Sequence, residues 1–436
     1  MPNGKHIAFN SRTAALAEVE DDFLNILNNI NKLDYNYLDK KNRILFDSML
    51  KNGYIIEDSY NELNELKYRN SIGKFNQEKL TLIIAPTLNC NFKCIYCYET
   101  PDTSIMNEST QESIIKFVNN YISTIKEVSI VWYGGEPLLC QDIINNISSK
   151  LIALCNKNNV LYTSFIITNG YLINDNTVKF LLNNSIFGAQ ITLDGPRDIH
   201  NKRRLLKSNS ENNFEKVVNS IKLLAQNNIA VSIRVNIDKT NLCYADDLLN
   251  FLKNNDMTNI FTYFAPVTDF TESCKSFSTT CYATHEYSEI SIILQKKLVE
   301  KGFKSGFDSS LYPLLKYNYC GADQINNFVI DPNGFLYKCM SEIGTLSKSI
   351  GDVKKYNFQN NKEFNRLLTY MTSSPFELDS CSKCKFIPMC MGGCPLIRTT
   401  TNKSSCDRWK YNLKDTMQTI YNYTNEYPNE FKNILD

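Results

Sequence analysis

The stretch that decides the fold reads Ala85-Pro-Thr-Leu-Asn-Cys-Asn-Phe-Lys-Cys-Ile-Tyr-Cys-Tyr-Glu99. Its cysteines, Cys90, Cys94 and Cys97, directly follow an apolar, strand-like run from Leu80 to Ala85. The spacing C-x3-C-x2-C allows three thiolates to hold three irons of a cubane iron–sulfur cluster, which leaves the fourth iron without a protein ligand. An iron with an open position can bind a small molecule and pass it an electron, whereas a four-cysteine cluster mainly carries electrons. The stretch therefore predicts a reactive cluster at the end of a strand.

Outward from this stretch, strand and helix patterns alternate along the chain. We expect strands at Leu80–Ala85, Val128–Tyr133, Tyr162–Thr168, Gly188–Leu193, Val231–Ile237 and Ile260–Ala265. Amphipathic helical patterns lie between them, at Glu112–Ile122, Asp142–Asn156, Asp175–Leu182, Phe214–Asn227 and Ala245–Asn254. Six β/α units in a row predict an α/β fold in which a parallel sheet is curved into a partial (β/α)6 barrel.

Unusual residues follow the ends of the expected strands. After the cysteines come Gly134-Gly-Glu-Pro137, Asn169-Gly170 and Asp194-Gly195, and Asn236 closes the fifth strand. Parallel α/β folds build their sites at the carboxyl ends of the strands, so these segments are expected to meet at one rim. Asn-Gly and Asp-Gly are also common turn pairs, which remains the alternative for those two segments.

The two ends of the chain differ from this pattern. Residues His6–Asn10 and Ala14–Val19 predict a hairpin, Asp21–Asn29 and Leu38–Lys51 predict helices, and Tyr54–Glu57 predicts a short strand. Together they suggest a small winged-helix-like module, followed by a polar linker at Glu62–Gln77. From about Cys320 the periodicity fails and turns and cysteines dominate, as in a small domain whose core is replaced by metal, and Asn412–Asp436 predicts a terminal helix or tail. The expected domains are residues 1–79, 80–290, a bridge at 291–318, 319–410 and 411–436.

Composition restricts the class of protein. The chain has 436 residues, of which 43% are apolar, and a formal net charge of +1 from 47 basic and 46 acidic side chains, so no global field attracts nucleic acid or an anionic membrane. No signal peptide and no apolar run of membrane-spanning length are visible, which predicts a soluble, cytoplasmic protein. Fifteen cysteines gathered in short intervals without an export signal favour metal ligation over disulfides.

From Leu80 to Trp409 the sequence resembles the radical S-adenosylmethionine enzymes that carry a C-terminal cysteine-rich SPASM domain. The resemblance implies a 4Fe–4S cluster on Cys90, Cys94 and Cys97, whose open iron chelates S-adenosylmethionine and, on reduction, releases a 5′-deoxyadenosyl radical. Tyr96, the aromatic before the last cysteine, is implied to contact the adenine. A zinc knuckle or a set of buried cysteines is the alternative.

The same resemblance nominates further cofactor-binding residues. Gly134, Gly135, Glu136 and Pro137 match the family's GGEP segment, in which the glycines admit the cofactor's amino group and Glu136 accepts a hydrogen bond from it. Arg204, in a segment similar to the family's H-x3-R, is the candidate for the cofactor carboxylate, with Arg203 as the adjacent alternative. His200 is expected to be structural, and no residue is assigned as a catalytic acid or base. The remaining candidates for the cofactor pocket are Asn169, Thr192, Asn236 and, on the same strand face as Asn236, Arg234.

Seven later cysteines match the SPASM pattern. The resemblance assigns Cys381, Cys384, Cys390 and Cys406 to one auxiliary cluster, and Cys320, Cys339 and Cys394 to another. The second set is one ligand short, and Lys304–Tyr319 contains no cysteine that could complete it. Either Cys274 or Cys281, from an expected loop at Thr268–Thr284, closes the set, or its open iron binds a substrate thiolate. A zinc ribbon on Cys381 and Cys384 is the alternative, and we expect Cys140, Cys155 and Cys243 to be buried in helices.

The leading hypothesis is therefore a peptide maturase that uses S-adenosylmethionine and three 4Fe–4S clusters to install a cysteine thioether in a ribosomally made peptide. The N-terminal module resembles the precursor-recognition element of such enzymes and could capture a leader peptide at a strand edge. A flavodoxin or ferredoxin is the expected electron donor. The alternatives are anaerobic sulfatase maturation, a carbon–carbon cross-linking or epimerising peptide enzyme, and a zinc-stabilised peptide-binding adaptor without activity. Met340 follows Cys339 where sulfatase-maturating enzymes usually place an aspartate base, which disfavours the first of these.

Overall fold

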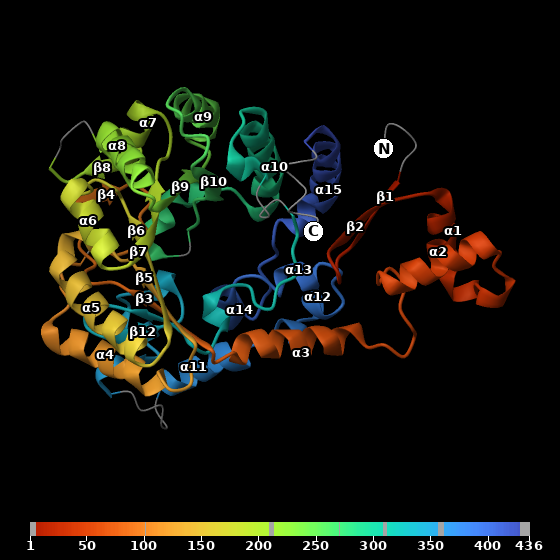
Figure 1. Ribbon diagram of the computed structural model, residues 1–436, viewed down its shortest axis with the longest axis horizontal. Helices are drawn as coiled ribbons and strands as arrows, with labels where there is room; N and C mark the ends of the chain where they lie inside the picture. The colour runs from red at the N-terminus through yellow and green to blue at the C-terminus, as the bar shows by residue number, and fades with distance from the viewer. Residues whose placement is uncertain are drawn as a thin grey trace. The chain divides into compact units, whose positions relative to one another are not determined.

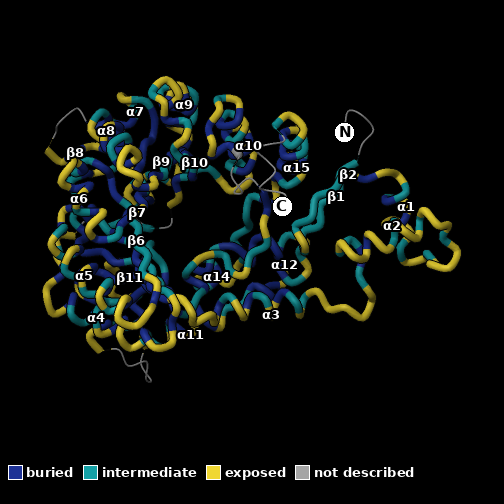
Figure 2. Tube along the Cα trace, viewed as in Figure 1, coloured by how far each residue is buried: buried dark blue, intermediate teal, exposed yellow. Residues whose placement is uncertain are grey.

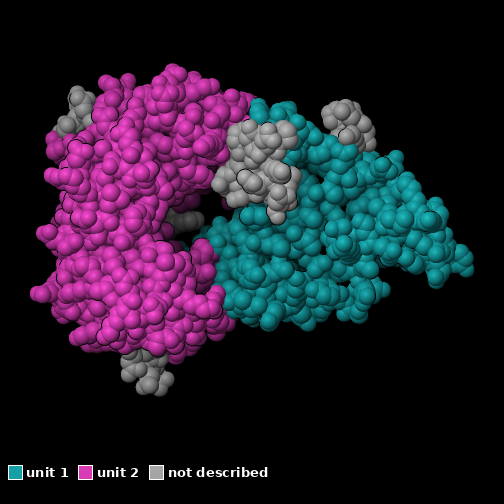
Figure 3. All heavy atoms as spheres, in the orientation of Figure 1, with its two compact units in different colours: residues 1–73, 309–319, 374–436 teal, residues 74–308, 320–373 magenta. Residues whose placement is uncertain are grey.

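The computed structural model describes residues 6–100, 102–208, 213–269, 271–307, 312–355 and 362–427. The chain divides into two compact units (Figure 3). The first unit described here, labelled unit 2 in Figure 3, comprises residues 74–308 and 320–373. The second, labelled unit 1 there, comprises residues 1–73, 309–319 and 374–436. Among the described residues, no helix is both long and apolar enough to cross a membrane.

The first unit is built on a nine-stranded sheet (Figure 1). Its six central strands pair in parallel in the order β10-β9-β7-β6-β5-β3 and do not close on themselves, which confirms the partial barrel. All six predicted strands exist, with ends that move by at most two residues. They are β3 (Lys79–Ile84), β5 (Glu127–Trp132), β6 (Leu161–Thr168), β7 (Ile186–Thr192), β9 (Ala230–Ile237) and β10 (Phe261–Pro266).

Amphipathic helices cover the outer face of this sheet (Figure 1). In α5 (Gln141–Lys157), Ile144, Ile147, Leu151 and Cys155 are fully buried at helical spacing, and α5 packs against β6. The other helices of this unit are α4 (Glu108–Tyr121), α6 (Asp175–Asn183), α7 (Arg197–Arg203), α8 (Asn213–Gln226), α9 (Ala245–Asn254), α10 (Thr284–Glu300) and α11 (Lys362–Thr372).

Three short strands after Cys320 extend the barrel sheet, which the sequence did not predict. The first, β11 (Asn327–Ile330), pairs in parallel with β3, and β12 (Phe335–Tyr337) and β13 (Gly351–Asp352) follow in antiparallel pairing. All four residues of β11 are buried, so no alternation marks it as a strand. The absent periodicity in this region therefore reflects strands of two to four residues.

The second unit begins with the predicted hairpin, β1 (His6–Asn10) and β2 (Ala15–Val19), followed by α1 (Asp21–Asn29) and α2 (Lys40–Lys51). A small core of Val19, Phe23, Ile26, Met49 and Ile55 holds them together. The predicted strand at Tyr54–Glu57 is wrong. The amides of Tyr54 and Ile55 both bond the Met49 carbonyl, so this segment closes the end of α2 instead of pairing with the hairpin.

The segment predicted to link the N-terminal module to the barrel, residues 62–77, is for the most part a helix, α3 (Glu62–Phe75), which the sequence did not predict. Leu66 of α3 packs in a core cluster with apolar residues from the C-terminal segment, namely Phe376, Leu378, Cys381, Ile387 and Met391. The buried Asn70 amide donates to the Tyr317 carbonyl at 2.6 Å. This helix is anchored by only a few apolar residues, and most of its other residues are charged or polar. Its sequence therefore resembles that of a linker.

The C-terminal segment of the second unit consists of short helices and one long one. The short helices are α12 (Asp379–Ser382), α13 (Ile387–Cys390) and α14 (Pro395–Thr401). The long helix α15 (Trp409–Glu426) confirms the predicted terminal helix; residues 428–436 of that prediction lie outside the described residues. Burial along the whole trace is drawn in Figure 2. Of the three cysteines expected to be buried, Cys140 and Cys155 are, but Cys243 is exposed.

Candidate active site

The three cysteines of the opening stretch lie in a loop after β3 that a small second sheet holds in place. In this sheet β4 (Phe92–Cys94) pairs antiparallel with β8 (Arg204–Leu206), and Cys94 lies opposite Arg204. The Ile95 amide also donates to the Arg203 carbonyl at 3.0 Å. Two segments that the sequence nominated separately are thus joined by their backbones.

The thiols of this loop are close enough to influence one another. Burial, with smaller contributions from the carboxylates of Glu136 and Glu99, respectively, and from Cys94, raises the pKa of Cys90 and of Cys97 to about 12. Burial also raises the pKa of Cys94, against which the positive charge of Arg204 acts. All three are free thiols. With their pKa raised, the three thiols would be protonated in the absence of a metal, and a bound metal would replace their protons. Three such neighbouring thiols fit the ligand set of a cubane iron–sulfur cluster.

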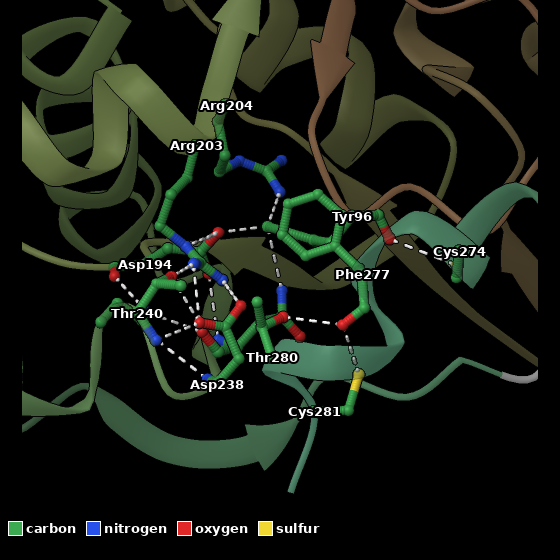
Figure 4. A network of polar contacts seen from close by, with 12 residues as sticks. Tyr96, Asp194, Arg203, Arg204, Asp238, Thr240, Cys274, Phe277, Thr280 and Cys281 are labelled. Carbon is green, nitrogen blue, oxygen red and sulfur yellow. Dashed lines mark hydrogen bonds and ion pairs between the residues drawn. The ribbon is translucent and has the colours of Figure 1, made fainter.

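A polar network fixes Tyr96 at the centre of the loop (Figure 4). Its hydroxyl donates to Asp194 and accepts from Arg204 Nη1 at 2.9 Å and from Asn236 Nδ2 at 3.2 Å. These partners come from the end of β7, from β8 and from β9, so three strand ends meet at one hydroxyl. Burial raises the pKa of Tyr96 well above its usual value, which keeps the phenol protonated as a donor.

The structure separates the two arginines that the sequence left as alternatives. Arg203 is committed to the scaffold: it forms a bidentate pair with Asp238 at 3.1 and 2.8 Å and donates to Thr240 at 2.7 Å. Its guanidinium also lies 5.1 Å from the centre of the Tyr96 ring. Arg204 donates through Nη1 to Tyr96, and its buried Nε has no partner within the described residues. The buried Nε of Arg203 has no hydrogen-bond partner there either, so the two side chains differ in the bidentate pairing of Arg203 with Asp238.

The glycines of the GGEP segment admit the chain's own backbone. A Cβ on Gly134, whose φ is +111°, would come within 2.3 Å of the Thr87 carbonyl oxygen, and one on Gly135 within 2.2 Å of the Asn89 carbonyl oxygen. The Glu136 amide donates to that same Asn89 oxygen at 2.9 Å. The sequence analysis attributed these glycines to the approach of a ligand; here they let the segment pack against the residues that lead into Cys90.

The Glu136 carboxylate is buried and already bonded. It accepts from the Thr168 hydroxyl at 2.7 Å, the Asn169 amide at 2.7 Å and the Leu138 amide at 3.1 Å, and its burial raises its pKa. Glu136 therefore ties the end of β5 to the end of β6. Pro137, the last residue of the segment, is buried and begins the short helix at Pro137–Cys140.

Other nominated residues lie at the same rim. Asn169 Nδ2 donates to Asn91 at 2.7 Å and lies 3.8 Å from Cys90 Sγ, which places this side chain beside the cysteine loop. Thr192 is the last residue of β7 and pairs with Arg234 of β9. His200 is buried, and its Nδ1 accepts the Asp194 amide at 3.4 Å, as expected of a structural residue.

Sequence reasoning missed several residues of this site. Asp194 was expected at the rim but was given no role, and Asp238 was not considered, yet both carboxylates hold the network around Tyr96. The available signal was their position, directly after β7 and β9. From the expected loop at 268–284, now a short helix at Glu272–Thr280, the buried Cys274 lies with its Sγ 3.6 Å from the Tyr96 carbonyl oxygen.

The four cysteines assigned to one auxiliary cluster line a single pocket of the second unit: Cys381, Cys384, Cys390 and Cys406. A tight turn brings the last of them to the others. Met391, Gly392 and Gly393 all have positive φ, and a Cβ on Gly393 would lie 1.6 Å from the Ser405 carbonyl oxygen. Four thiols around one pocket fit a fully ligated cluster.

Within the described residues, no three His, Cys, Asp or Glu side chains surround a point where one metal ion could bind. In a cubane each cysteine takes a different iron, so its ligands stand farther apart than those of a single zinc ion. Cys320 and Cys339 belong to the first unit and Cys394 to the second, so the three-cysteine set stays a prediction.

Part of the chain is similar to known proteins. The family model of the radical SAM superfamily matches residues 84–252. The cysteine-type anaerobic sulfatase-maturating enzyme of Clostridium novyi (strain NT) is 26% identical over 73% of this chain and 88% of its own length. The radical SAM cyclopropyl synthase TigE of Paramaledivibacter caminithermalis is 23% identical over 58% of each chain.

Two solved structures share the fold. Native anSMEcpe with bound AdoMet and Cp18Cys peptide has a TM-score of 0.62 at 23% identity and covers 79% of this chain and 99% of its own. Streptococcus suis SuiB bound to precursor peptide SuiA has a TM-score of 0.53 at 15% identity and covers 92% and 95%, respectively. At sequence identities this low, the structural similarity shows a shared fold and nothing further.

Proposed function

Since its match over residues 84–252 makes this chain a radical SAM superfamily enzyme, we propose that it is a peptide maturase that forms a cysteine thioether in a ribosomally made peptide. Membership of the superfamily implies S-adenosylmethionine and a 4Fe–4S cluster. We further propose that the chain holds two auxiliary clusters, on the cysteine sets described above.

The N-terminal hairpin is the observation that supports a peptide as the substrate. Strands β1 and β2 pair only with each other among the described residues, so each has a free edge that could pair with an extended peptide. Both solved structures compared above contain a peptide. SuiB, which is named as bound to a precursor peptide, covers more of this chain than anSMEcpe does, including most of its N-terminal part.

The chain's own residues would hold the cofactor at the rim of the barrel. When bound, the cluster and S-adenosylmethionine supply the one-electron chemistry that removes a hydrogen atom from the substrate. Arg204 offers its unused Nε to a carboxylate, and Asn169 lies beside the cysteine loop. Arg203, Asp194 and Asp238 keep Tyr96 in place against the adenine site proposed for it.

The cysteine count favours a sulfur-containing substrate. The set Cys320, Cys339 and Cys394 lacks a fourth ligand, and a peptide thiolate could supply it. Forming the thioether breaks one C–H and one S–H bond and makes one C–S bond. The peptide therefore loses two hydrogens and two electrons. One hydrogen atom goes to the adenosyl group, the thiol proton goes to solvent, and the second electron goes to an auxiliary cluster.

Sulfatase maturation is the second candidate, because several relatives bear that name. Met340 occupies the position after Cys339 where a base would be expected. The next carboxylate, Glu342, is buried and accepts the Tyr370 hydroxyl at 2.9 Å, which ties it to the scaffold. We therefore rank this candidate below the thioether maturase.

The test is co-expression of the enzyme with the cysteine-containing precursor peptide encoded beside its gene, followed by mass spectrometry before and after iodoacetamide. A thioether product has lost two hydrogens and its cysteine resists alkylation. A carbon–carbon cross-link shows the same loss with a reactive thiol, and a formylglycine product reacts with a hydrazide. Either of the last two results would refute the thioether. Cys94→Ala is the control that should leave the peptide unmodified and S-adenosylmethionine uncleaved.

A further inference from the structure

Positive charge is concentrated around the four-cysteine pocket. Whereas the chain as a whole carries a net charge of +1, residues 377–415 contain seven Lys and Arg side chains and four acidic ones, Glu377, Asp379, Asp407 and Asp415. Lys383, Lys385, Lys403, Lys410 and Lys414 are exposed. Asp407 is half-buried and pairs with Lys316 at 3.3 Å, so it offsets little of the exposed charge.

Three of these lysines, Lys385, Lys410 and Lys414, line one hollow that is open to solvent; we call them the lysine patch. Apolar and aromatic side chains, among them Phe386, Trp409 and Tyr411, line it as well. Lys385 and Lys414 form no ion pair within the described residues. A surface of this kind is complementary to an acidic partner.

The lysine patch adjoins the four-cysteine pocket directly. Phe386, Trp409 and Lys410 line both the pocket and the hollow. Lys410 Nζ lies 3.4 Å from Cys406 Sγ. Cys384 and Cys406 are only half-buried, so a cluster held there would lie close to the surface. A partner seated on the patch would therefore be within a few side chains of the cysteines.

We propose that the lysine patch is the docking surface of an acidic, one-electron carrier protein, which delivers electrons to the cluster that the adjacent cysteines would hold. The carrier loses one electron and the cluster gains it, and no bond is made or broken. This inference rests on the proposed function, because only an enzyme that uses such clusters needs an electron donor.

The features of the patch suit a carrier. Contacts between electron-transfer proteins are small and transient, and opposite charges make them form rapidly. Because exposed charges are screened by salt, such association weakens as ionic strength rises. A cysteine-lined pocket beside a basic hollow offers what this encounter requires, namely a redox site near the surface and charge that attracts the partner.

The test uses the full chain with its clusters reconstituted and reduced flavodoxin as the carrier. The Lys385→Glu/Lys414→Glu variant is compared with Lys157→Glu/Lys179→Glu, which makes the same change of charge at exposed lysines of α5 and α6. Stopped-flow absorbance follows cluster reduction at low and high salt, and a titration gives the flavodoxin Kd. We expect the patch variant to lower the rate constant about tenfold or more at low salt and to lose most of the salt dependence. The control variant should change both much less.

Equal effects in the two variants, or none in the patch variant, would overturn the proposal. So would a patch variant that loses affinity for the precursor peptide and keeps that for flavodoxin, because the surface would then belong to the peptide. A small reductant such as titanium citrate should reduce both variants and the wild type equally, which shows intact clusters. Since no peptide product is measured, failure here is distinguishable from failure of the thioether assignment.

Discussion

At the scale of single residues, the site is organised by buried ion pairs around one phenol. Arg203 serves two carboxylates: its pair with Asp238 is bidentate, and its Nε lies 3.8 Å from Asp194. Asp194 in turn receives the Tyr96 hydroxyl and, through its other oxygen, the Asn236 amide at 3.0 Å. The position of the ring in the cysteine loop thus depends on charged side chains at the ends of β7, α7 and β9.

Removing the Arg203 side chain should therefore lower the stability of the fold and also loosen the position of the Tyr96 ring. In Arg203→Met the buried Asp238 loses its cation, and we expect unfolding to become easier by about 3 to 5 kcal/mol. Urea denaturation of the cluster-free chain measures this change. The double variant Arg203→Met/Asp238→Leu should recover much of the loss, because it leaves one charge fewer without a partner. A double variant that is as unstable as the sum of the two single ones would contradict the coupling.

His200 gives the fold a defined response to acid. Burial, followed by the charges of Arg204 and Arg203, lowers its pKa well below the usual value, so the folded chain keeps it neutral. The unfolded chain takes up a proton near pH 6.5. As the pH falls below that value, His200 lowers the unfolding free energy by up to about 1.4 kcal/mol per unit.

This response can be isolated by substitution. In His200→Asn the amide oxygen can replace Nδ1 as acceptor for the Asp194 amide, while the titration disappears. Urea midpoints of the cluster-free chain at pH 7.5 and 5.5 should differ less for this variant than for the wild type. The same difference in both would show that the acid response arises elsewhere.

At the scale of elements, the sequence predicted the helices and strands that have a regular pattern of apolar residues. It missed the short strands that have no such pattern. The six parallel strands were predictable because each is an apolar run, and five of them have a polar or glycine-containing site segment at the end. The small sheet of β4 and β8 was not, since each strand has three residues and their pairing joins positions 92–94 to 204–206. The cysteines and Arg204 could be predicted as site residues because they belong to short motifs in the sequence. The hydrogen-bonded network of Asp194, Arg203 and Asp238 could not be predicted, because it depends on which strand ends lie together in the fold.

The close contact between the GGEP segment and the cysteine loop leads to a prediction about cluster assembly. In Gly135→Ala the new Cβ would meet backbone atoms of Asn89, so the loop before Cys90 must move. We expect less iron at the three-cysteine site, seen as a lower iron content and weaker cluster absorbance after reconstitution. Gly302→Ala is the matched control, since nothing lies within 4 Å of its Cβ and only its φ of +79° costs about 1 kcal/mol. Equal iron in both variants would contradict the argument.

At the scale of the whole molecule, the iron content separates the proposed enzyme from a zinc-stabilised adaptor. Three 4Fe–4S clusters predict about twelve irons per chain in anaerobically prepared protein. The variant Cys381→Ala/Cys384→Ala removes two ligands from the four-cysteine pocket, so it should retain about eight irons. Iron, sulfide and zinc analysis checks both values. Zinc in place of iron would favour the adaptor.

The second unit is assembled from three segments that are far apart in the sequence. The Tyr312 hydroxyl donates to the Ala14 carbonyl across 298 residues, and the Tyr421 hydroxyl donates to Glu18. On the ribosome, at about 5 to 20 residues per second, the hairpin would therefore wait about 15 to 60 s for Tyr312 and longer for α15. During that time its strand edges are exposed, and the barrel, encoded in between, can fold first. The first part of this protein to be synthesised is thus among the last to reach its final contacts.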